Sequence, residues 1–281
     1  MPPTISHSER QDSPLPSVLS GPHDSLRKNP LCNDPASHSP KRSRPESLYR
    51  SNSMEPIFQN RRDAGRRLAA GLRAYAHLPN VLVLGLTRGG VPVAFEIAKA
   101  LRAPLDIVVV RKLGAPGNPE LAVGAIGPGN ECVWNTALIK ELRLSQESLD
   151  AIARNENAER LRREKYYRGH APQLSAADKI VLLVDDGIAT GASIRAAARA
   201  VRHTKPARLV LASPVAAADL LPILRSEADD VIVLSTPEFF LGVGQWYRDF
   251  PQTDDSEVIS CLSEAQKWCP FPSFQNPTIP G

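Results

Sequence analysis

The sequence predicts an α/β fold built on a doubly wound, mainly parallel sheet, and three observations predict it. From residue 54 onward, apolar strand-like runs alternate with helix-like stretches, which is the pattern of a parallel sheet with helices on both faces. The run at residues 181–184 is apolar throughout, as expected of a strand that is buried on both faces. This run ends in two aspartates and a glycine-rich turn, and open α/β sheets bind their ligands at that end of the strands.

The first expected elements are an amphipathic helix over residues 61–78, a strand over 81–86 and a helix over 91–101. Apolar residues recur at helical spacing along the first helix. Pro92 falls in the first turn of the second helix, where a missing N–H costs nothing. The later elements are a strand at 105–110, a hairpin of 122–126 with 131–134, a long helix at 145–168, the strand at 181–184, a helix at 194–202, a strand at 208–213, a helix near 216–227 and a strand at 230–234.

Composition divides the chain into three parts. Residues 1–53 are crowded with proline, serine and charge, so they cannot bury enough apolar surface to offset their ordering entropy, and we expect disorder there. The basic run at residues 40–45 is interpreted as part of a solvated tail, with a nuclear signal or an acid-binding patch as alternatives. One folded domain is expected over residues 54–262, followed by an irregular tail at 263–281.

Charge and cysteine usage argue against several classes of protein. The net charge of +4 is mild for a nucleic-acid binder, and the arginines of the long helix alternate with glutamates, so no specific nucleic-acid partner is expected. Cys32, Cys132, Cys261 and Cys269 lack the spacing of a zinc site or a disulfide framework, which favours a reducing, cytoplasmic compartment. No apolar run approaches the roughly 20 residues that a membrane helix needs, so no membrane partner is expected.

The motif at residues 185–193 carries the most specific chemical signal. Asp185 and Asp186 end the buried strand, and their carboxylates suit hydroxyl groups or a hydrated metal ion. The small residues that follow reach a helix N-terminus, whose free amides and dipole favour a phosphate. A ribose 5-phosphate would suit both parts of the motif, with its hydroxyls at the acids and its phosphate at the turn. The alternative is that the motif binds no ligand and the strand merely ends in two acids. The turn residues expected to bind the ligand are Gly187, Ile188, Ala189, Thr190, Gly191, Ala192 and Ser193.

The turn after the first strand is a second constellation. It holds Thr87, Arg88, Gly89 and Gly90, whose two glycines let a ligand approach the main chain while the arginine adds a positive charge. An ordinary turn explains these residues when they are taken alone. Because the turn comes one strand before the acidic motif, we expect it to bind part of the same ligand.

Residues 111–121, after the second strand, form a third constellation. Arg111 and Lys112 open it, and glycine and proline punctuate a segment that is expected to continue neither strand nor helix. A long loop with charge at its base is typical of a water-excluding lid, and Glu120 is a further candidate within it. A solvated surface loop is the alternative.

Aromatic residues gather at residues 239–250, after the last strand. Trp246 and Tyr247 are candidates to stack a planar heterocycle. Core packing explains the two rings equally well, so both interpretations stay open.

Taken together, these motifs resemble type I phosphoribosyltransferases. Residues 181–193 are similar to the family's phosphoribosylpyrophosphate-binding motif, except that Gly187 stands where an apolar side chain usually follows the second acid. The turn at 86–90 resembles the family's pyrophosphate loop, which often holds a non-proline cis peptide, here expected between Thr87 and Arg88.

The resemblance extends over about residues 54–258. Residues 111–121 look like the family's flexible catalytic loop, whose basic residues reach the departing pyrophosphate, and residues 236–262 look like a small C-terminal hood over the base. The GQWYRDF stretch is similar to an orphan group of bacterial-type phosphoribosyltransferases whose acceptor is not assigned.

The resemblance implies transfer of the 5-phosphoribosyl group between phosphoribosylpyrophosphate and a nitrogen acceptor such as a nucleobase, with release of pyrophosphate. Mg²⁺ is expected near Asp185 and Asp186 through the substrate and waters, with no direct protein ligand. Arg111 and Lys112 are the expected catalytic cations, and a homodimer is expected. The alternatives are a non-catalytic sensor of phosphoribosylpyrophosphate or nucleotides with the same fold, and a hydrolase that transfers the group to water.

Overall fold

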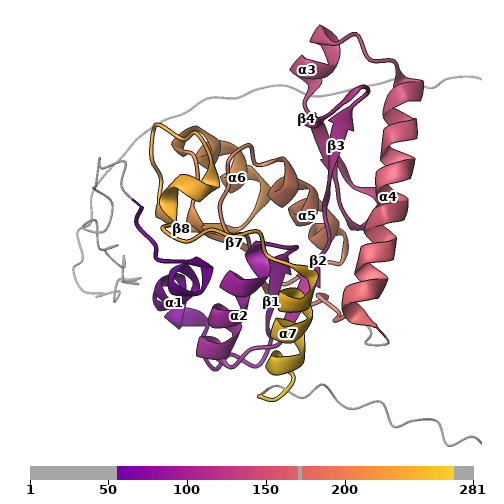
Figure 1. Cartoon of the computed structure of the whole chain (residues 1–281). Helices are drawn as coiled ribbons and strands as arrows, with labels where there is room; N and C mark the ends of the chain where they lie inside the picture. The colour runs from indigo at the N-terminus through magenta and orange to yellow at the C-terminus, as the bar shows by residue number, and fades with distance from the viewer. Residues whose placement is uncertain (1–55, 170–172, 269–281) are drawn as a thin grey trace, which may run out of the picture. The chain divides into compact units, whose positions relative to one another are not determined.

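A computed structural model describes residues 56–169 and 173–268. Residues 1–53, for which disorder is expected, and residues 269–281 of the expected irregular tail lie outside the described residues. The central sheet is parallel, with the strand order β2-β1-β6-β7-β8, and it confirms the predicted α/β fold (Figure 1). Its strands are β1 (Val81–Leu86), β2 (Leu105–Val108), β6 (Ile180–Val184), β7 (Arg208–Val215) and β8 (Asp230–Ser235).

The strand order creates a topological switch beside β1. On one edge β1 pairs with β2, with Val83 opposite Leu105, and on the other edge it pairs with β6, with Val83 opposite Leu182. The carboxyl ends of β1 and β6 are therefore neighbours, which is where open α/β sheets bind ligands. Every residue of β1 is buried because helices cover both faces of the sheet.

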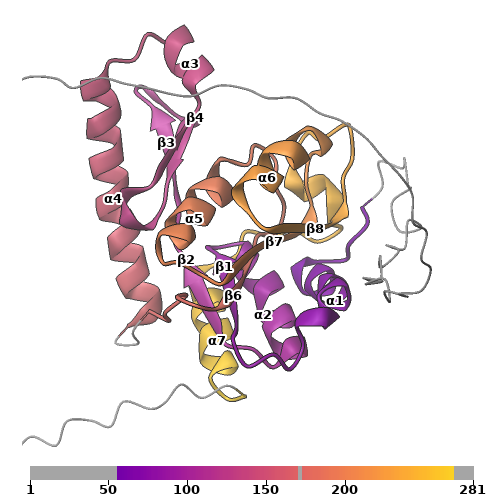
Figure 2. The same ribbon diagram turned by 180° about the vertical axis from the view of Figure 1, so that it is seen from behind.

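The two helical layers follow from the alternation of side chains along the strands. Val83 joins the apolar core on one face of the sheet, and Leu84 joins the core on the other. Figures 1 and 2 show the two layers from opposite sides. The first face carries α1 (Arg61–Gly71), α2 (Gly90–Leu101) and α7 (Asp255–Ala265), and the second carries α5 (Ala192–His203) and α6 (Leu221–Glu227).

A smaller antiparallel sheet follows β2 and corrects one expectation. It has the order β3-β4-β5, formed by β3 (Arg111–Ala115), β4 (Asn118–Ile126) and β5 (Cys132–Trp134). The expectation that residues 111–121 continue neither strand nor helix is therefore wrong, because they form β3, the turn of the hairpin and the start of β4.

Burial explains why this hairpin forms in spite of its glycines and prolines. Leu113 and Val123 are buried in a cluster that also contains Ile152 of α4 (Gln146–Arg168). Gly117 lies in the turn with a φ of +75°, a conformation that favours glycine. Figure 1 shows the hairpin running beside α4.

Other boundaries also differ from those expected. The first helix ends at Gly71 rather than at residue 78, and the second strand ends at Val108 rather than at 110. Helix α7 was not expected, and its residues Val258 and Cys261 are buried in the core on the α2 side of the sheet. The short elements are α3 (Thr136–Glu141) and 3₁₀ turns at Arg73–Tyr75, Pro128–Asn130, Ala218–Leu220 and Val243–Trp246.

Candidate active site

The topological switch brings the turn after β1 against the acidic motif after β6. A Cβ atom built on Gly90 would lie 2.6 Å from the Val184 carbonyl oxygen, and one built on Gly89 would overlap the Asp186 carboxylate. A side chain at position 90 would collide with the backbone of the acidic motif, and one at position 89 would displace the Asp186 carboxylate, so packing favours glycine at both positions. The peptide between Thr87 and Arg88 is cis, which confirms the expectation from the resemblance.

The glycine-rich turn ends at an uncapped helix. Gly191 is the N-cap residue of α5 with a φ of +72°, and no side chain in the described part of the chain caps the helix. Its first amides and the positive end of its dipole are thus available to an anion. Thr190 is exposed and Ser193 is half-buried beside these amides, so both hydroxyls lie where the sequence predicts a phosphate.

Asp185 is a partly buried carboxylate whose charge has no ionic partner among the residues that the structure describes. Its Oδ1 accepts a hydrogen bond from the amide of Asp186 at 2.9 Å. Burial and the neighbouring negative charge of Asp186 raise the pKa of Asp185 well above its ordinary value. A cation or a hydrogen-bond donor that arrived with a ligand would stabilise this group.

Asp186 is placed differently. Its Oδ2 accepts a hydrogen bond from Nε of Arg61 at 2.7 Å, within an ion pair in which both side chains are largely buried. Burial raises the pKa of Asp186, while the charge of Arg61 opposes that shift. Sequence reasoning expects both acids to face the sugar, whereas the structure pairs one of them with an arginine from α1.

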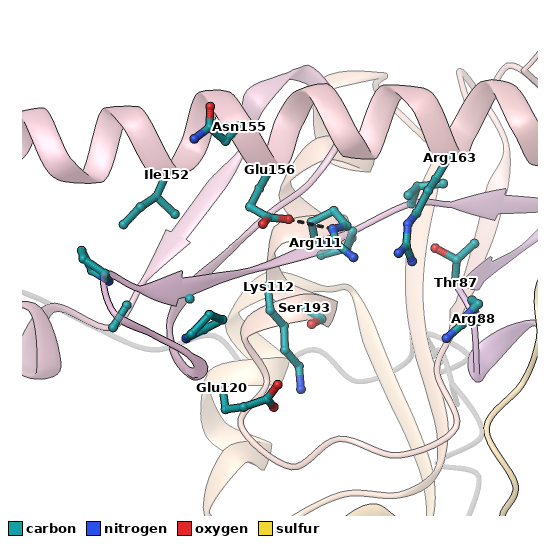
Figure 3. Close-up of a pocket in the computed structure, with 16 residues that line it drawn as sticks. Thr87, Arg88, Arg111, Lys112, Glu120, Ile152, Asn155, Glu156, Arg163 and Ser193 are labelled. Atoms are coloured by element: carbon teal, nitrogen blue, oxygen red, sulfur yellow. Dashed lines mark hydrogen bonds and ion pairs between the residues drawn. The ribbon is translucent and has the colours of Figure 1, made fainter.

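A cavity of about 550 Å³ adjoins these loops and lies between the β3–β4 hairpin and α4 (Figure 3). It brings together Thr87 and Arg88 of the second constellation with residues of the third, whereas Gly89, Gly90 and the two acids do not line it. Figure 3 shows Arg111 facing Glu156 of α4, and Lys112 on the other side of β3. The Nε atom of Arg111 lies 2.8 Å from Oε2 of Glu156. Among the residues that line it are Thr87, Arg88, Arg111, Lys112, Glu120, Ile152, Asn155, Glu156, Arg163 and Ser193.

Helix α4 contributes four lining residues that sequence reasoning missed, of which Glu156 and Arg163 are charged. The alternation of charges along this helix predicts a solvated face, and Arg163 does pair with Glu159, 2.8 Å apart. Arg163 nevertheless lines the cavity, as does Glu156. No local signal distinguishes these two positions from the exposed charges around them, because the hairpin that covers them comes from another part of the chain.

The arginine of the turn after β1 is supported from the C-terminal helix. Arg88 Nη1 lies 3.4 Å from Asp255 Oδ1 at the start of α7, and the hydroxyl of Tyr167 donates to the same oxygen at 2.6 Å. Burial and this hydrogen bond raise the pKa of Tyr167 to about 12. Asp255 therefore connects the end of α4, the start of α7 and the turn after β1.

The two candidate stacking rings lie in the core. Trp246 and Tyr247 are only 3% and 4% exposed and pack with Phe58. This burial favours core packing over stacking of a heterocycle. The Tyr247 hydroxyl donates to the carbonyl oxygen of Asp186 at 2.5 Å, so this side chain supports the backbone of the acidic motif.

The departure at Gly187 also has a structural reason. A Cβ atom built on Gly187 would overlap Cγ1 of Val243 and lie 2.8 Å from its Cγ2. Val243 begins the 3₁₀ turn at Val243–Trp246. An apolar side chain from another segment thus occupies the space beside Gly187.

No helix among residues 56–169 and 173–268 is long and apolar enough to cross a membrane.

Comparison with known proteins agrees with this geometry. The family model described as the phosphoribosyl transferase domain matches residues 54–248. Proteins of Mycobacterium tuberculosis strains CDC 1551 and H37Rv, provisionally named phosphoribosyl transferases, are each 44% identical over 211 residues, which is 75% of this chain and 47% of theirs. The chain thus spans about half the length of these curated relatives. The crystal structure of TT1426 from Thermus thermophilus has 42% identity and a TM-score of 0.62, over 74% of this chain and 98% of that one. The match over residues 54–248 shows that this chain belongs to the phosphoribosyl transferase domain family.

Proposed function

We propose that this protein transfers the 5-phosphoribosyl group between phosphoribosylpyrophosphate and a nitrogen acceptor such as a nucleobase, with release of pyrophosphate. One observation carries the proposal: two glycine-lined loops meet at the switch between β1 and β6, beside a cavity lined by Arg88, Arg111 and Lys112. The uncapped amides of α5 suit the 5-phosphate, and the three cations suit the pyrophosphate.

The reaction breaks the bond from C1 of the sugar to the pyrophosphate oxygen and forms a bond from C1 to the acceptor nitrogen. The electron pair leaves with pyrophosphate, and the acceptor nitrogen loses its proton to solvent. Asp185 orients the sugar hydroxyls and its negative charge favours the positive charge that develops at C1. Binding of the 5-phosphate at residues 187–193 holds the reacting carbon in position.

The chemistry of the acidic motif fits Mg²⁺. Asp185 offers a hard carboxylate oxygen and its charge is unpaired among the described residues, so it suits a hydrated cation held largely by the substrate. Bound there, the ion would neutralise the leaving pyrophosphate. Arg88 and Lys112 would contact the same group from the cavity side.

We also propose that the protein acts as a homodimer in the cytoplasm. The described cysteines, Cys132 and Cys261, are free thiols, which suits a reducing compartment. Light scattering on the purified full chain tests the dimer, and fractionation of the source cells tests the compartment.

The proposed activity is tested by two measurements on the full chain. Isothermal titration with phosphoribosylpyrophosphate and Mg²⁺ measures binding, and a pyrophosphate-release screen across nucleobases measures turnover. Lys112→Ala should lower turnover at least tenfold, while Lys140→Ala, an exposed lysine of α3, should not change it. Binding without turnover on any base would favour a sensor, release without a base would favour a hydrolase, and no binding would refute the proposal.

A further inference from the structure

Arg61, at the start of α1, directs its guanidinium group towards the acidic motif and residues 250–251. Its Nε lies 2.7 Å from Asp186 Oδ2, and its Nη1 donates to the carbonyl oxygen of Pro251 at 2.6 Å. The guanidinium carbon lies 3.7 Å from the centre of the Phe250 ring, a cation–π contact. Only 11% of the side chain is exposed, so Arg61 is not an ordinary surface arginine.

Asp186 is held from three directions by elements that are remote in sequence. Arg61 binds its carboxylate, Gly89 of the turn after β1 packs against the same group, and Tyr247 donates to its carbonyl oxygen. Asp185, one residue earlier, has no ionic partner in the described residues. The two adjacent acids therefore stand in different states before any ligand binds.

We infer that Arg61 is a positioning residue, which holds Asp186 against the turn after β1 and leaves Asp185 as the acid that meets the ribosyl group. This inference rests on the proposed function. Loss of one partner of a buried ion pair leaves the other charge uncompensated. Among the described residues Arg61 is the cation paired with Asp186, and without it the carboxylates of Asp185 and Asp186 would face each other with no such partner. Repulsion between the two carboxylates would then move Asp186 away from the turn after β1 and towards the ligand.

The test measures binding of phosphoribosylpyrophosphate with Mg²⁺ by isothermal titration, which needs no acceptor. The variants are Arg61→Met, Arg61→Lys, Asp186→Asn and the double variant Arg61→Met/Asp186→Asn. Arg67→Met is the matched control, because Arg67 lies on the same helix and makes the same kinds of contact as Arg61, but not with Asp185 or Asp186. Its Nη2 lies 3.0 Å from Asp63 Oδ2, and its guanidinium carbon lies 5.7 Å from the centre of the Phe58 ring.

We expect Arg61→Met to weaken binding roughly 10- to 100-fold at unchanged stoichiometry. Arg61→Lys should restore most of the affinity, and Arg67→Met should bind like the wild type. The double variant should bind within about threefold of Asp186→Asn alone, because Arg61 acts through Asp186.

Three outcomes would overturn the inference. Wild-type affinity in Arg61→Met would mean that the ion pair does not position the site. A fall in stoichiometry at unchanged affinity would mean that Arg61 only maintains folding. Losses that add in the double variant would mean that Arg61 acts independently of Asp186. If the wild type itself binds no phosphoribosylpyrophosphate, the proposed function fails and the inference fails with it.

Discussion

Replacement of Gly187 by alanine should destabilise the protein through a single steric contact. The new Cβ atom would overlap Cγ1 of Val243 and lie 2.8 Å from Cγ2 and 3.0 Å from Cβ. These are atoms of a short, β-branched side chain, so they cannot swing away as the end of a lysine would. The φ of Gly187 lies outside the left-handed region, so the contact is the only reason for a penalty.

The expected cost is about 1–3 kcal/mol, which is typical of overpacking by one methyl group. For a domain of this size that corresponds to a fall in Tm of about 2–12 °C. Val243→Ala removes both methyl groups that collide, at a cost of about 1 kcal/mol because the side chain is half-buried. In the double variant most of the overpacking cost should disappear, because only the 3.0 Å approach to the Val243 Cβ atom is left, which gives a favourable coupling energy of about 1–3 kcal/mol.

Urea unfolding of the four proteins measures this coupling directly. Gly242→Ala is the control: it lies in the same segment, its φ of 177° is extended, and no atom lies within 4 Å of the built Cβ. That variant should stay within about 0.5 kcal/mol of the wild type. A coupling energy near zero, or a Gly242→Ala variant as unstable as Gly187→Ala, would refute the steric reasoning.

Three further predictions concern the site itself. Asp185→Asn should unfold at higher urea concentration than the wild type at pH 7 but lose affinity for phosphoribosylpyrophosphate. The pKa of Asp185 is raised in the folded protein, so its protonated form stabilises the fold fully below about pH 3.9, and this contribution is lost as the pH rises through the folded pKa. The stability advantage of Asp185→Asn over the wild type should therefore be absent at low pH. Equal stability of the two proteins at pH 7 would contradict this sign. Gly191→Val should cost at least about 1–2 kcal/mol, because φ is +72° there, and should abolish binding of ribose 5-phosphate in a titration; unchanged affinity would exclude the phosphate turn. Glu156→Gln should release Arg111 and tighten pyrophosphate binding by up to about fivefold, and weaker binding would show that the pair is needed to hold β3.

The central sheet could be predicted closely because its strands allow one interpretation. An apolar run such as Val181–Val184 between turn residues is too short for a helix and too hydrophobic for a loop. The β3–β4 hairpin was missed because Gly114, Pro116 and Pro119 suggest a loop, whereas burial against α4 decides the outcome. Helix α7 did leave a local signal: Asp254 accepts from the amide of Glu257 at 2.7 Å, and an acid three residues before a glutamate is typical of a helix start.

The sequence likewise reveals the parts of the site that are built from consecutive residues, but not the parts that are built from residues far apart in the chain. Both ligand-binding turns could be located because their chemistry depends on consecutive residues: glycines for close approach, and acids at the end of a strand. The roles of Arg61 and Arg163 could not be predicted from the sequence, because each looks like any charged residue on the polar side of a helix. Arg61 meets Asp186 across 125 positions of sequence, and Arg163 lines the cavity only because the hairpin lies opposite it.

The asymmetry of the acidic pair follows from charge balance. Two adjacent, largely buried carboxylates repel one another and lose hydration, so both stay ionised only if cations compensate them. Among the described residues the chain supplies one such ion-pair partner, Arg61, which contacts Asp186 and acts on Asp185 only from a greater distance. The charge of Asp185 is then left for a cation that arrives with the substrate, which is what a magnesium-bound pyrophosphate provides. A second fixed arginine at this point would make the free protein more stable and would compete with the substrate for the same carboxylate. Leaving Asp185 unpaired therefore costs stability in the free protein and favours the bound state, and this predicts that phosphoribosylpyrophosphate with Mg²⁺ raises the Tm of the wild type more than that of Asp185→Asn.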